Sequence, residues 1–263
     1  MADAQAGTHA AAQRIAALEA ELAAVRAEMQ DFSYTVSHDL RASLRHILSY
    51  AQLVQEDAAP LLGAETLGFV TTISDSARHM GVLMDGLMEL SRLGTVAVTL
   101  ATVPLQALVQ DVVAELQQKH SNDSMDWQVQ PDLPEVLADA TLLRAALLQV
   151  LGNAVKFTAH KELRQVKVSA QRDAANAQVL LQIQDNGAGF NPALQSKLFK
   201  PFSRLHTIKQ FPGIGMGLAL TRKMLARMGA QVQAGGVVDG GCTVRITLPI
   251  TLSGATHCAT LPA

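Results

Sequence analysis

One histidine in this sequence is followed directly by a carboxylate, within a segment of helical periodicity. His38 and Asp39 lie in the stretch SHDLRASLRHI. At about 100° per residue, His38 falls opposite the apolar positions Leu40, Leu44 and Ile47, so we expect it to face solvent. A neutral imidazole nitrogen is a nucleophile toward phosphoryl groups, and Asp39 could fix its tautomer and remove its proton. Exposed histidines are common on amphipathic helices, so the interpretation of His38 depends on a phosphoryl donor elsewhere in the chain.

A second group of polar residues ends a predicted helix in the stretch QVLGNAVKFT, residues 149–158. The side-chain oxygen of Asn153 suits a Mg²⁺ ion that also keeps waters and phosphate oxygens. Lys156 lies near the same helix end and could reach a phosphate group. The alternative is an ordinary helix end whose polar residues face solvent.

The stretch DNGAGF, residues 185–190, follows a predicted strand. Asp185 is an acceptor at the strand end and could take the amino group of adenine. Gly187 and Gly189 allow the backbone to turn tightly and to approach a flat base. The alternative is a simple turn, which Asp-Asn-Gly forms readily.

The stretch GIGMGL, residues 213–218, opens a predicted helix. Gly213, Gly215 and Gly217 would let backbone N–H groups point at phosphates, where the helix dipole favours negative charge. No Gly-Lys-Ser/Thr follows, so this is not a Walker loop, and the spacing is not that of a dinucleotide-binding fingerprint.

Two heptad-like segments precede these motifs. Apolar residues at alternating spacings of three and four run through Ile15, Leu18, Leu22, Val25, Met29, Phe32 and Val36, and again through Val70, Ile73, Ala77, Met80, Met84 and Leu87. Pro60 and Gly63 mark a break between them. Two helices with one narrow apolar seam each cannot form a complete core, so we expect a homodimer built as a four-helix bundle. A monomeric hairpin docked on the second domain is the alternative.

The pattern changes after Leu93, and the remaining chain mixes strands and helices. We expect strands at residues 96–103, 125–130, 135–137, 166–171, 178–184, 231–234 and 242–248, and helices at 105–119, 140–157 and 215–228. Asp139 is placed to cap the second of these helices. This order predicts an α/β sandwich with a mixed or antiparallel sheet. Residues 1–9 are expected to be a frayed tail, and the tail after Ile250 has no periodicity.

Bulk properties exclude several classes of protein. The 263 residues carry a net charge of −2, which is unlike the basic balance of a nucleic-acid binder. Cys242 and Cys258 do not form a metal-like pair, and a reducing cytoplasm is expected. No apolar run is long enough to span a bilayer, and no signal peptide is apparent. A sensor for any input signal would therefore lie in a partner, in a further part of a longer chain or in the short N-terminal segment.

In their order and separation, the three glycine- and asparagine-containing segments resemble the N, G1 and G2 boxes of the GHKL superfamily, which includes histidine kinases, gyrase B subunits, MutL and Hsp90. LFKPFSRLH, residues 198–206, resembles the F box of histidine kinases, and the His38 segment resembles their H box. The resemblance covers most of residues 30–250. It implies a phosphotransfer hairpin followed by a Bergerat-type ATP-binding α/β sandwich.

The resemblance also assigns roles to particular residues. Asn153 would bind Mg²⁺, with Gln149 as a second candidate ligand, Lys156 would contact phosphate, and Phe157 would line the nucleotide pocket. Asp185 would bind the adenine amino group, Gly187 and Gly189 would shape the pocket, and Gly213, Gly215 and Gly217 would cradle the phosphates. Thr243 would lie near adenine. Residues 191–212 would form a mobile lid, which Phe199 and Phe202 would anchor rather than stack on the base.

Three positions depart from the family pattern. Gln149 stands where many members have asparagine, so metal geometry could loosen. Ala42 stands where members with phosphatase activity often have a Thr or Asn that positions water, which predicts weak phosphatase activity. Ser43 replaces a frequent proline, which predicts a shallower helix bend.

We therefore expect Mg-ATP-dependent autophosphorylation of His38, with Asp39 assisting, followed by transfer to a response-regulator receiver domain. The expected division is a coiled-coil segment at 1–30, a dimerisation and phosphotransfer domain at 31–93, a linker at 94–103, a catalytic domain at 104–250 and a tail at 251–263. Two alternatives remain open: an ATP-holding scaffold that transfers little, and a GHKL ATPase of the MutL or Hsp90 kind.

Overall fold

The computed structural model describes residues 2–120 and 124–250, and the chain divides into two compact units between Thr95 and Val96. The expected tail at 251–263, with Cys258, lies outside the described residues.

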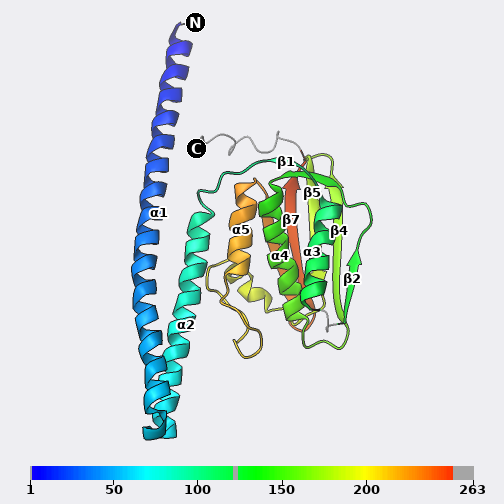
Figure 1. Ribbon diagram of the computed structural model, residues 1–263. Helices are drawn as coiled ribbons and strands as arrows, with labels where there is room; N and C mark the ends of the chain where they lie inside the picture. Colours follow the sequence, from blue (N-terminus) through cyan, green and yellow to red (C-terminus); the bar gives the residue numbers. More distant parts are fainter. Residues whose placement is uncertain (1, 121–123, 251–263) are drawn as a thin grey trace. The chain divides into compact units, whose positions relative to one another are not determined.

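The first unit is a helical hairpin (Figure 1). Helix α1 spans Ala2–Ala58, the short 3-10 helix η1 spans Ala59–Leu61, and helix α2 spans Ala64–Arg92. The break therefore falls at Pro60 and Gly63, as the sequence indicates. The expected frayed tail at 1–9 is wrong for the described backbone from Ala2, because an alanine-rich segment has high helix propensity and continues α1 to its start.

The two hairpin helices bury mostly small residues between them. The buried positions of α1 are Ser37, Leu44 and Ala51, and those of α2 are Ser74, Ala77 and Gly86. The α1 positions are seven residues apart, which is the spacing of a helix seam that stays on one face. Small side chains at this seam let the helices approach closely while larger apolar side chains remain outside it.

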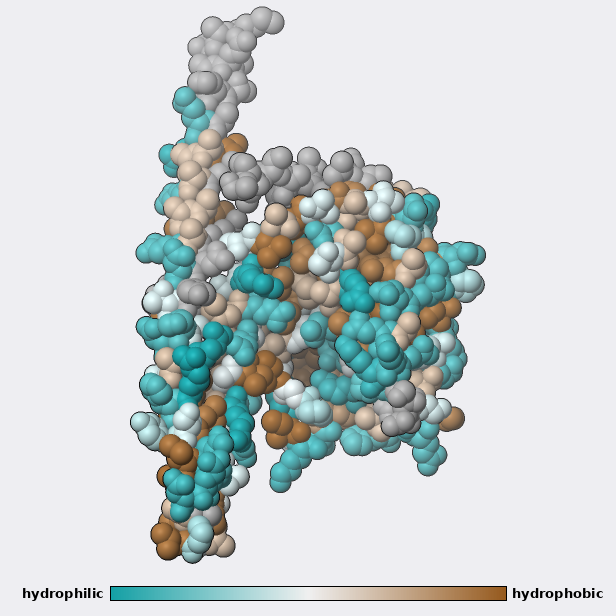
Figure 2. Space-filling view, in the orientation of Figure 1, coloured by the Kyte–Doolittle hydropathy of each residue, from teal (hydrophilic) through white to brown (hydrophobic). Residues whose placement is uncertain are grey.

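Those larger side chains form an exposed apolar stripe on each helix. The stripe of α1 contains Val36, Leu40, Ile47 and Val54, and that of α2 contains Phe69, Ile73, Met80 and Leu87; all are at least 38% exposed. Brown, apolar surface is visible along the hairpin in Figure 2. The expected seam residues Ile15, Leu18, Leu22, Val25 and Met29 are also exposed, whereas the Phe32 side chain lies outside the described part.

The second unit is an α/β sandwich. Its five-stranded sheet has the order β2-β4-β5-β7-β6, in which β2 and β4 are parallel and the other neighbours are antiparallel. The strands are β2 (Met125–Val129), β4 (Arg164–Asp173), β5 (Gln178–Asp185), β6 (Gln231–Val237) and β7 (Gly241–Pro249). A separate antiparallel pair joins β1 (Ala101–Pro104) to β3 (Glu135–Ala138). The sheet is thus mixed, as expected.

Three helices cover one face of this sheet (Figure 1). They are α3 (Leu105–Lys119), α4 (Ala140–Phe157) and α5 (Gly217–Arg227). Helix α4 supplies the centre of the core, since its buried residues recur every three or four positions and include Leu143, Leu147 and Leu151, which are fully buried. Leu181 of β5 and Ile246 of β7 are fully buried as well.

One expected strand is shorter than the sequence suggests. Residues 96–100 alternate in hydrophobicity but lie outside β1, which begins at Ala101. The backbone N–H of Thr99 donates to Oδ2 of Asp139 rather than to a strand partner. The same carboxylate caps α4, because its Oδ1 accepts from the backbone N–H groups of Thr141 and Leu142.

Candidate functional site

His38 is presented to solvent on α1. Its side chain is 65% exposed, and its Nδ1 lies 3.1 Å from Oδ1 of Asp39. A carboxylate can only accept a hydrogen bond, so this contact favours the tautomer with hydrogen on Nδ1 and a free lone pair on Nε2. The neighbouring Ser37 is buried against the hairpin, which fixes the helix face and turns His38 outward.

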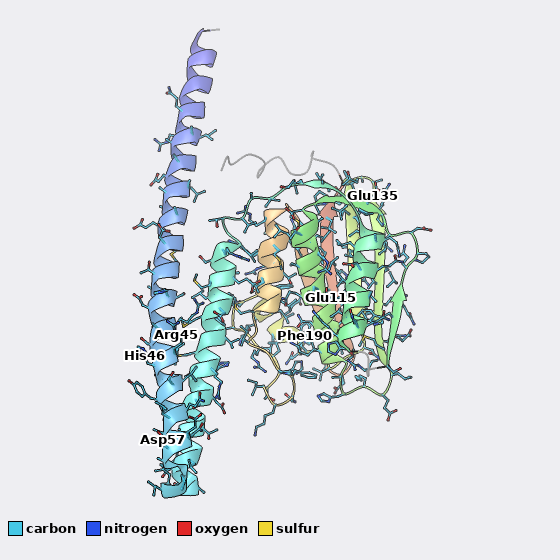
Figure 3. All side chains as sticks on the ribbon, viewed as in Figure 1. Arg45, His46, Asp57, Glu115, Glu135 and Phe190 are labelled. Carbon is cyan, nitrogen blue, oxygen red and sulfur yellow. The ribbon has the colours of Figure 1, made fainter. Side chains whose placement is uncertain are left out.

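A cross-hairpin ion pair lies three residues beyond His38. Nη2 of Arg41 donates to Oδ1 of Asp85 on α2 at a distance of 2.7 Å. Both side chains are about half exposed or more, so the pair adds little stability, but it sets the relation between the two helices near His38. Arg45 and His46 project from the next turn of α1 (Figure 3).

The second unit gathers polar groups at the C-terminal end of α4. Gln149, Asn153 and Lys156 recur at spacings of four and three, so they share one helix face, and all are half-buried. Glycines of the GIGMGL segment lie directly against this face. A Cβ on Gly217 would come within 2.6 Å of Oε1 of Gln149 and 3.7 Å of Nδ2 of Asn153, and one on Gly213 would come within 3.7 Å of Nζ of Lys156.

Lys156 is a poorly hydrated cation. Burial, with the nearby Arg204 guanidinium as a smaller cause, lowers the pKa of its ammonium group. Its Nζ lies 4.4 Å from the centre of the Phe157 ring. A cation held in this way gains from an anionic ligand that restores its lost solvation, and phosphate is such a ligand.

Asp185 is a buried carboxylate at the end of β5. Its Oδ1 accepts the backbone N–H groups of Gly187, at 2.8 Å, and of Cys242, at 3.2 Å. Burial raises its pKa, and these two N–H groups oppose the rise. Both hydrogen bonds that the described residues give the Asp185 side chain reach Oδ1, so Oδ2 remains available as an acceptor for a ligand.

The turn after Asp185 is packed too closely for side chains. A Cβ on Gly187 would lie 2.6 Å from the carbonyl oxygen of Phe157. Gly189 has a φ of +59°, and a Cβ there would lie 1.8 Å from the carbonyl oxygen of Val237. The backbone N–H of Ala188 donates to the Phe157 carbonyl at 3.0 Å. The end of α4 and the Asp185 turn therefore form one rigid edge.

Strand β7 brings Thr243 and Cys242 to this edge. Cys242 is opposite Asp185 in the strand register, and the half-buried Thr243 is opposite Gln184. Burial, together with the Asp185 carboxylate, raises the pKa of the Cys242 thiol to about 12, so this cysteine is not a thiolate nucleophile at neutral pH.

Residues 191–212, termed the lid loop, follow this turn and contain the 3-10 helix η2 (Pro192–Lys197). The anchoring of this loop differs from the sequence expectation. Phe202 is 40% exposed, with a φ of 60°, so it is not a buried anchor, and Phe199 is half-buried. Phe211 is buried instead and contacts the Phe157 ring edge to face, at a centroid distance of 5.0 Å.

Two further lid residues were missed by the sequence reasoning. Arg204 donates from Nη2 to the carbonyl oxygen of Phe211 at 2.8 Å and from Nη1 to that of Gly213. Nε2 of His206 lies 2.8 Å from the carbonyl oxygen of Gly189. Both residues lie in the RLH that ends the F-box-like stretch, which was the signal in the sequence. Their contacts could not be predicted from it, because they depend on the conformation of an irregular loop.

The end of α4, the Asp185 turn and two of the expected glycines, Gly213 and Gly217, thus lie together at one edge of the second unit, while His38 and Asp39 lie in the first. Gly215 packs instead against the backbone of Ser203, and Thr243, next to Cys242 on β7, faces the side of the sheet opposite to Asp185. Within the described ranges, no cluster of three or more His, Cys, Asp or Glu residues could hold a metal ion. A Mg²⁺ ion would instead need amide and phosphate oxygens, and the amides of Gln149 and Asn153, which lie beside Gly217, fit the amide part of that donor set. Among helices of the described chain, none has the length and hydropathy to cross a membrane.

Two family models match the chain. The His Kinase A (phospho-acceptor) domain matches residues 28–95, and the histidine kinase-, DNA gyrase B- and HSP90-like ATPase matches residues 138–252. The first match contains His38, and the second contains all the expected nucleotide residues.

Individual proteins are also similar to the chain over most of its length. The chain is 28% identical to Cyanobacterial phytochrome A of Nostoc sp. over 91% of its length and 31% of that protein, and 28% identical to the circadian input-output histidine kinase CikA of Synechococcus elongatus over 86% of its length and 30% of that protein. It thus spans less than a third of these relatives. The crystal structure of full-length ShkA in complex with AMPPNP matches 84% of this chain and 46% of that one, with 29% identity and a TM-score of 0.59.

Proposed function

Because the chain belongs to the histidine kinases, we propose that it phosphorylates its own His38 from Mg-ATP and then passes the phosphoryl group to an aspartate of a response-regulator receiver domain. The observation that carries this proposal is the outward-facing His38, whose Nδ1 is held by Asp39 within the segment that matches a phospho-acceptor domain.

The proposed transfer uses the free nitrogen of His38. Nε2 attacks the γ-phosphorus of ATP, the Nε2–P bond forms, the bond from phosphorus to the β,γ-bridging oxygen breaks, and ADP leaves. The imidazole becomes positively charged as this bond forms. Asp39 stabilises that charge through Nδ1 and accepts the Nδ1 proton, which leaves a neutral phosphohistidine ring.

The second unit supplies the proposed nucleotide site. The adenine amino group donates to Oδ2 of Asp185, whose other oxygen is fixed by two backbone N–H groups. Lys156 and the backbone of Gly213, Gly215 and Gly217 would face the phosphates, which is supported by the position of Gly213 beside the Lys156 ammonium group. The cost of burying both the Asp185 carboxylate and the Lys156 ammonium is offset when each meets a complementary group of the nucleotide.

Mg²⁺ would be held by the side-chain oxygen of Asn153, with Gln149 as a further ligand, and would neutralise charge on the transferring phosphoryl group. Gln149 keeps an amide at its position, and its Oε1 lies against Gly217. The extra methylene of Gln149, compared with asparagine, is therefore compatible with an amide that reaches the phosphate-facing backbone.

Weak phosphatase activity is proposed from Ala42. This residue lies four positions, about one helical turn, after His38, and its methyl group cannot hold a hydrolytic water. The phosphoryl group on the partner aspartate would then be lost mainly by routes other than this protein.

We also propose that the active form is a homodimer in which the exposed stripes of α1 and α2 from two chains form a four-helix bundle. Side chains such as Ile47, 41% exposed, and Ile73, 51% exposed, would be covered by the second copy. The same proposal divides the chain into domains at residues 30/31, 93/94 and 103/104. It also includes a cytoplasmic location and an upstream sensor domain or protein.

The proposal is tested by incubating the full chain with γ-labelled ATP and Mg²⁺ and following protein-bound label, released phosphate and nucleotide binding together. We expect acid-labile, base-stable label on the protein, which is the stability of a phosphoramidate, and its transfer to a receiver domain added afterwards. His46→Gln, a change to an exposed histidine on the same helix, serves as the matched control for His38→Gln.

Three outcomes would contradict the proposal. Nucleotide binding without label in any form would favour an ATP-holding scaffold. Rapid phosphate release without a phosphoprotein would favour an ATPase of the MutL or Hsp90 kind. Label that survives His38→Gln would exclude His38 as the acceptor.

A further inference from the structure

The ring of His206 joins three separate parts of the nucleotide-binding edge. Its Nε2 lies 2.8 Å from the Gly189 carbonyl oxygen. A carbonyl oxygen only accepts, so Nε2 carries the hydrogen and donates to the turn that follows Asp185. The other faces of the ring contact aromatic side chains, which ties the lid loop to the end of α4.

Those aromatic contacts form a three-ring cluster. The His206 ring lies 5.5 Å from the Phe157 ring and 5.1 Å from the Phe211 ring, measured between centroids, and the two phenylalanine rings are 5.0 Å apart. Such edge-to-face and tilted arrangements are attractive beyond the burial of their area. Phe157 comes from α4, whereas His206 and Phe211 come from the lid loop.

The acceptor of the His206 hydrogen bond is held in place independently. Gly189 packs so closely against the Val237 carbonyl that there is no room for a Cβ, and the backbone N–H of the neighbouring Ala188 donates to the Phe157 carbonyl. These contacts form a closed loop. The Phe157 carbonyl accepts from Ala188, the adjacent Gly189 carbonyl accepts from His206, and the His206 ring packs near the Phe157 ring. The lid loop is therefore fastened to the turn that carries Asp185 and to the helix that carries Lys156.

We infer that His206 is a positioning residue that fastens the lid loop to the adenine-binding turn and so sets the affinity for the nucleotide. This inference rests on the proposed function for the identity of the ligand. His206 acts through Gly189 and Phe157, and the transfer of the phosphoryl group to His38 does not involve it directly. Its loss should therefore raise the Kd and KM for ATP much more than it lowers kcat at saturating ATP.

Two substitutions separate the two contacts of the ring. His206→Phe keeps an aromatic ring against Phe157 and Phe211 but removes the donor to Gly189. His206→Gln keeps an N–H donor but removes the ring. Loss of one partly buried hydrogen bond corresponds to about a fivefold to tenfold loss of affinity. We expect each of these two variants to lose nucleotide affinity by about this factor. His206→Ala removes both contacts, so it should bind the nucleotide more weakly than either.

His160 offers a matched control on the same cluster. Its ring lies 5.1 Å from the Phe211 ring, and its Nε2 lies 3.2 Å from the carbonyl oxygen of Gln210, but its side chain is exposed, and its described contacts are with the lid loop and do not include the Gly189 turn. His160→Ala thus removes a histidine that touches the lid without cutting the link to Gly189. We expect it to change ATP affinity less than twofold.

The experiment measures binding of AMPPNP with Mg²⁺ by calorimetry and the ATP dependence of autophosphorylation, on the full chain and the four variants. Thermal unfolding of each variant shows whether it is folded. The expected result is weaker binding for the His206 variants, a raised KM, a saturating rate within about twofold of the parent, and little change for His160→Ala. Tryptic cleavage at the lid lysines should also be faster in His206→Phe with nucleotide present.

Several results would overturn the inference. Parent-like binding by all three His206 variants would show that the ring does not set affinity. An equal loss in His160→Ala would show that any disturbance of the lid has the same effect. A lowered saturating rate with unchanged KM would place His206 in the chemical step instead. If the parent itself fails to bind AMPPNP, the proposed function fails first, and the role of His206 fails with it.

Discussion

Nδ1 of His38 lies 3.1 Å from Oδ1 of Asp39, although both side chains are largely exposed and adjacent in sequence. A contact between two such exposed side chains contributes little to stability. The contact is better understood through chemistry, because it selects the tautomer that leaves Nε2 free and provides an acceptor for the proton on Nδ1.

Replacing Asp39 by asparagine should therefore separate chemistry from folding. Asp39→Asn retains an oxygen that can accept from Nδ1 but cannot take up the proton or stabilise the charged ring. Loss of a positioned general base costs about 10²-fold or more in rate, and we expect a fall of this size in the saturating rate of autophosphorylation. Unchanged thermal unfolding and unchanged AMPPNP binding are the controls; a parent-like rate would remove Asp39 from the mechanism.

Asp185→Asn should weaken nucleotide binding while it stabilises the protein at neutral pH. The amide keeps a side-chain oxygen for the Gly187 and Cys242 N–H groups but loses the charge that accepts the adenine amino group. Loss of a hydrogen bond to a buried charged group corresponds to roughly 10- to 100-fold in affinity. Calorimetric titration with AMPPNP checks the first part, and chemical denaturation at pH 7 checks the second.

The pH dependence of that stability difference follows from the sign of the Asp185 shift. Burial raises the pKa of Asp185 in the folded protein, so above that pKa the folded state bears the cost of a desolvated carboxylate. The cost disappears as the pH falls through the folded pKa and the group takes up a proton. The advantage of Asp185→Asn in free energy of unfolding should therefore shrink on acidification, and an advantage that grows on acidification would contradict the assignment.

Gly189→Ala should destabilise the second unit. A side chain at a φ of +59° costs roughly 1–3 kcal/mol in backbone strain, and the added Cβ would lie 1.8 Å from the Val237 carbonyl oxygen. Urea denaturation provides the measurement. Gly235→Ala in β6 is the matched control, because a Cβ added at Gly235 would meet nothing within 4 Å and the φ of this residue is not positive; equal stability losses in both variants would refute the steric argument.

A charge on the exposed stripe of α1 should weaken the proposed dimer. Ile47→Glu places a carboxylate where the second copy would cover an isoleucine, and burial of such a side chain contributes about 1.5–3 kcal/mol, so we expect at least a tenfold rise in the dimer dissociation constant. Sedimentation equilibrium measures it. His46→Glu, at the neighbouring exposed position, should leave the dimer intact, and a monomeric parent protein would contradict the dimer outright.

The parts of the fold that were predictable are those with strong local signals. Asp139 caps α4 as its sequence position indicates, and Pro60 and Gly63 mark the hairpin turn. The expected strand at residues 96–103 is too long, because the Thr99 N–H is taken by the Asp139 side chain, a contact between residues forty positions apart. Alternation alone does not reveal such a competing partner.

The candidate site shows the same limit. Motif spacing was enough to bring Asn153, Lys156 and Asp185 into consideration, because each lies at the end of a regular element. The contacts of Phe211 and His206 depend on how an irregular loop folds back on the Gly189 turn, and for that reason the sequence wrongly indicates the exposed Phe202 as an anchor. Aromatic character in a loop indicates burial somewhere but does not say which ring is buried.

Peptide mapping of the phosphorylated chain tests the central claim most directly. The full protein is incubated with Mg²⁺ and γ-labelled ATP, digested at alkaline pH, and the labelled residue is identified. We expect label on His38 in the parent and in His46→Gln, and none in His38→Gln. Label on another residue, or label that persists in His38→Gln, would contradict it.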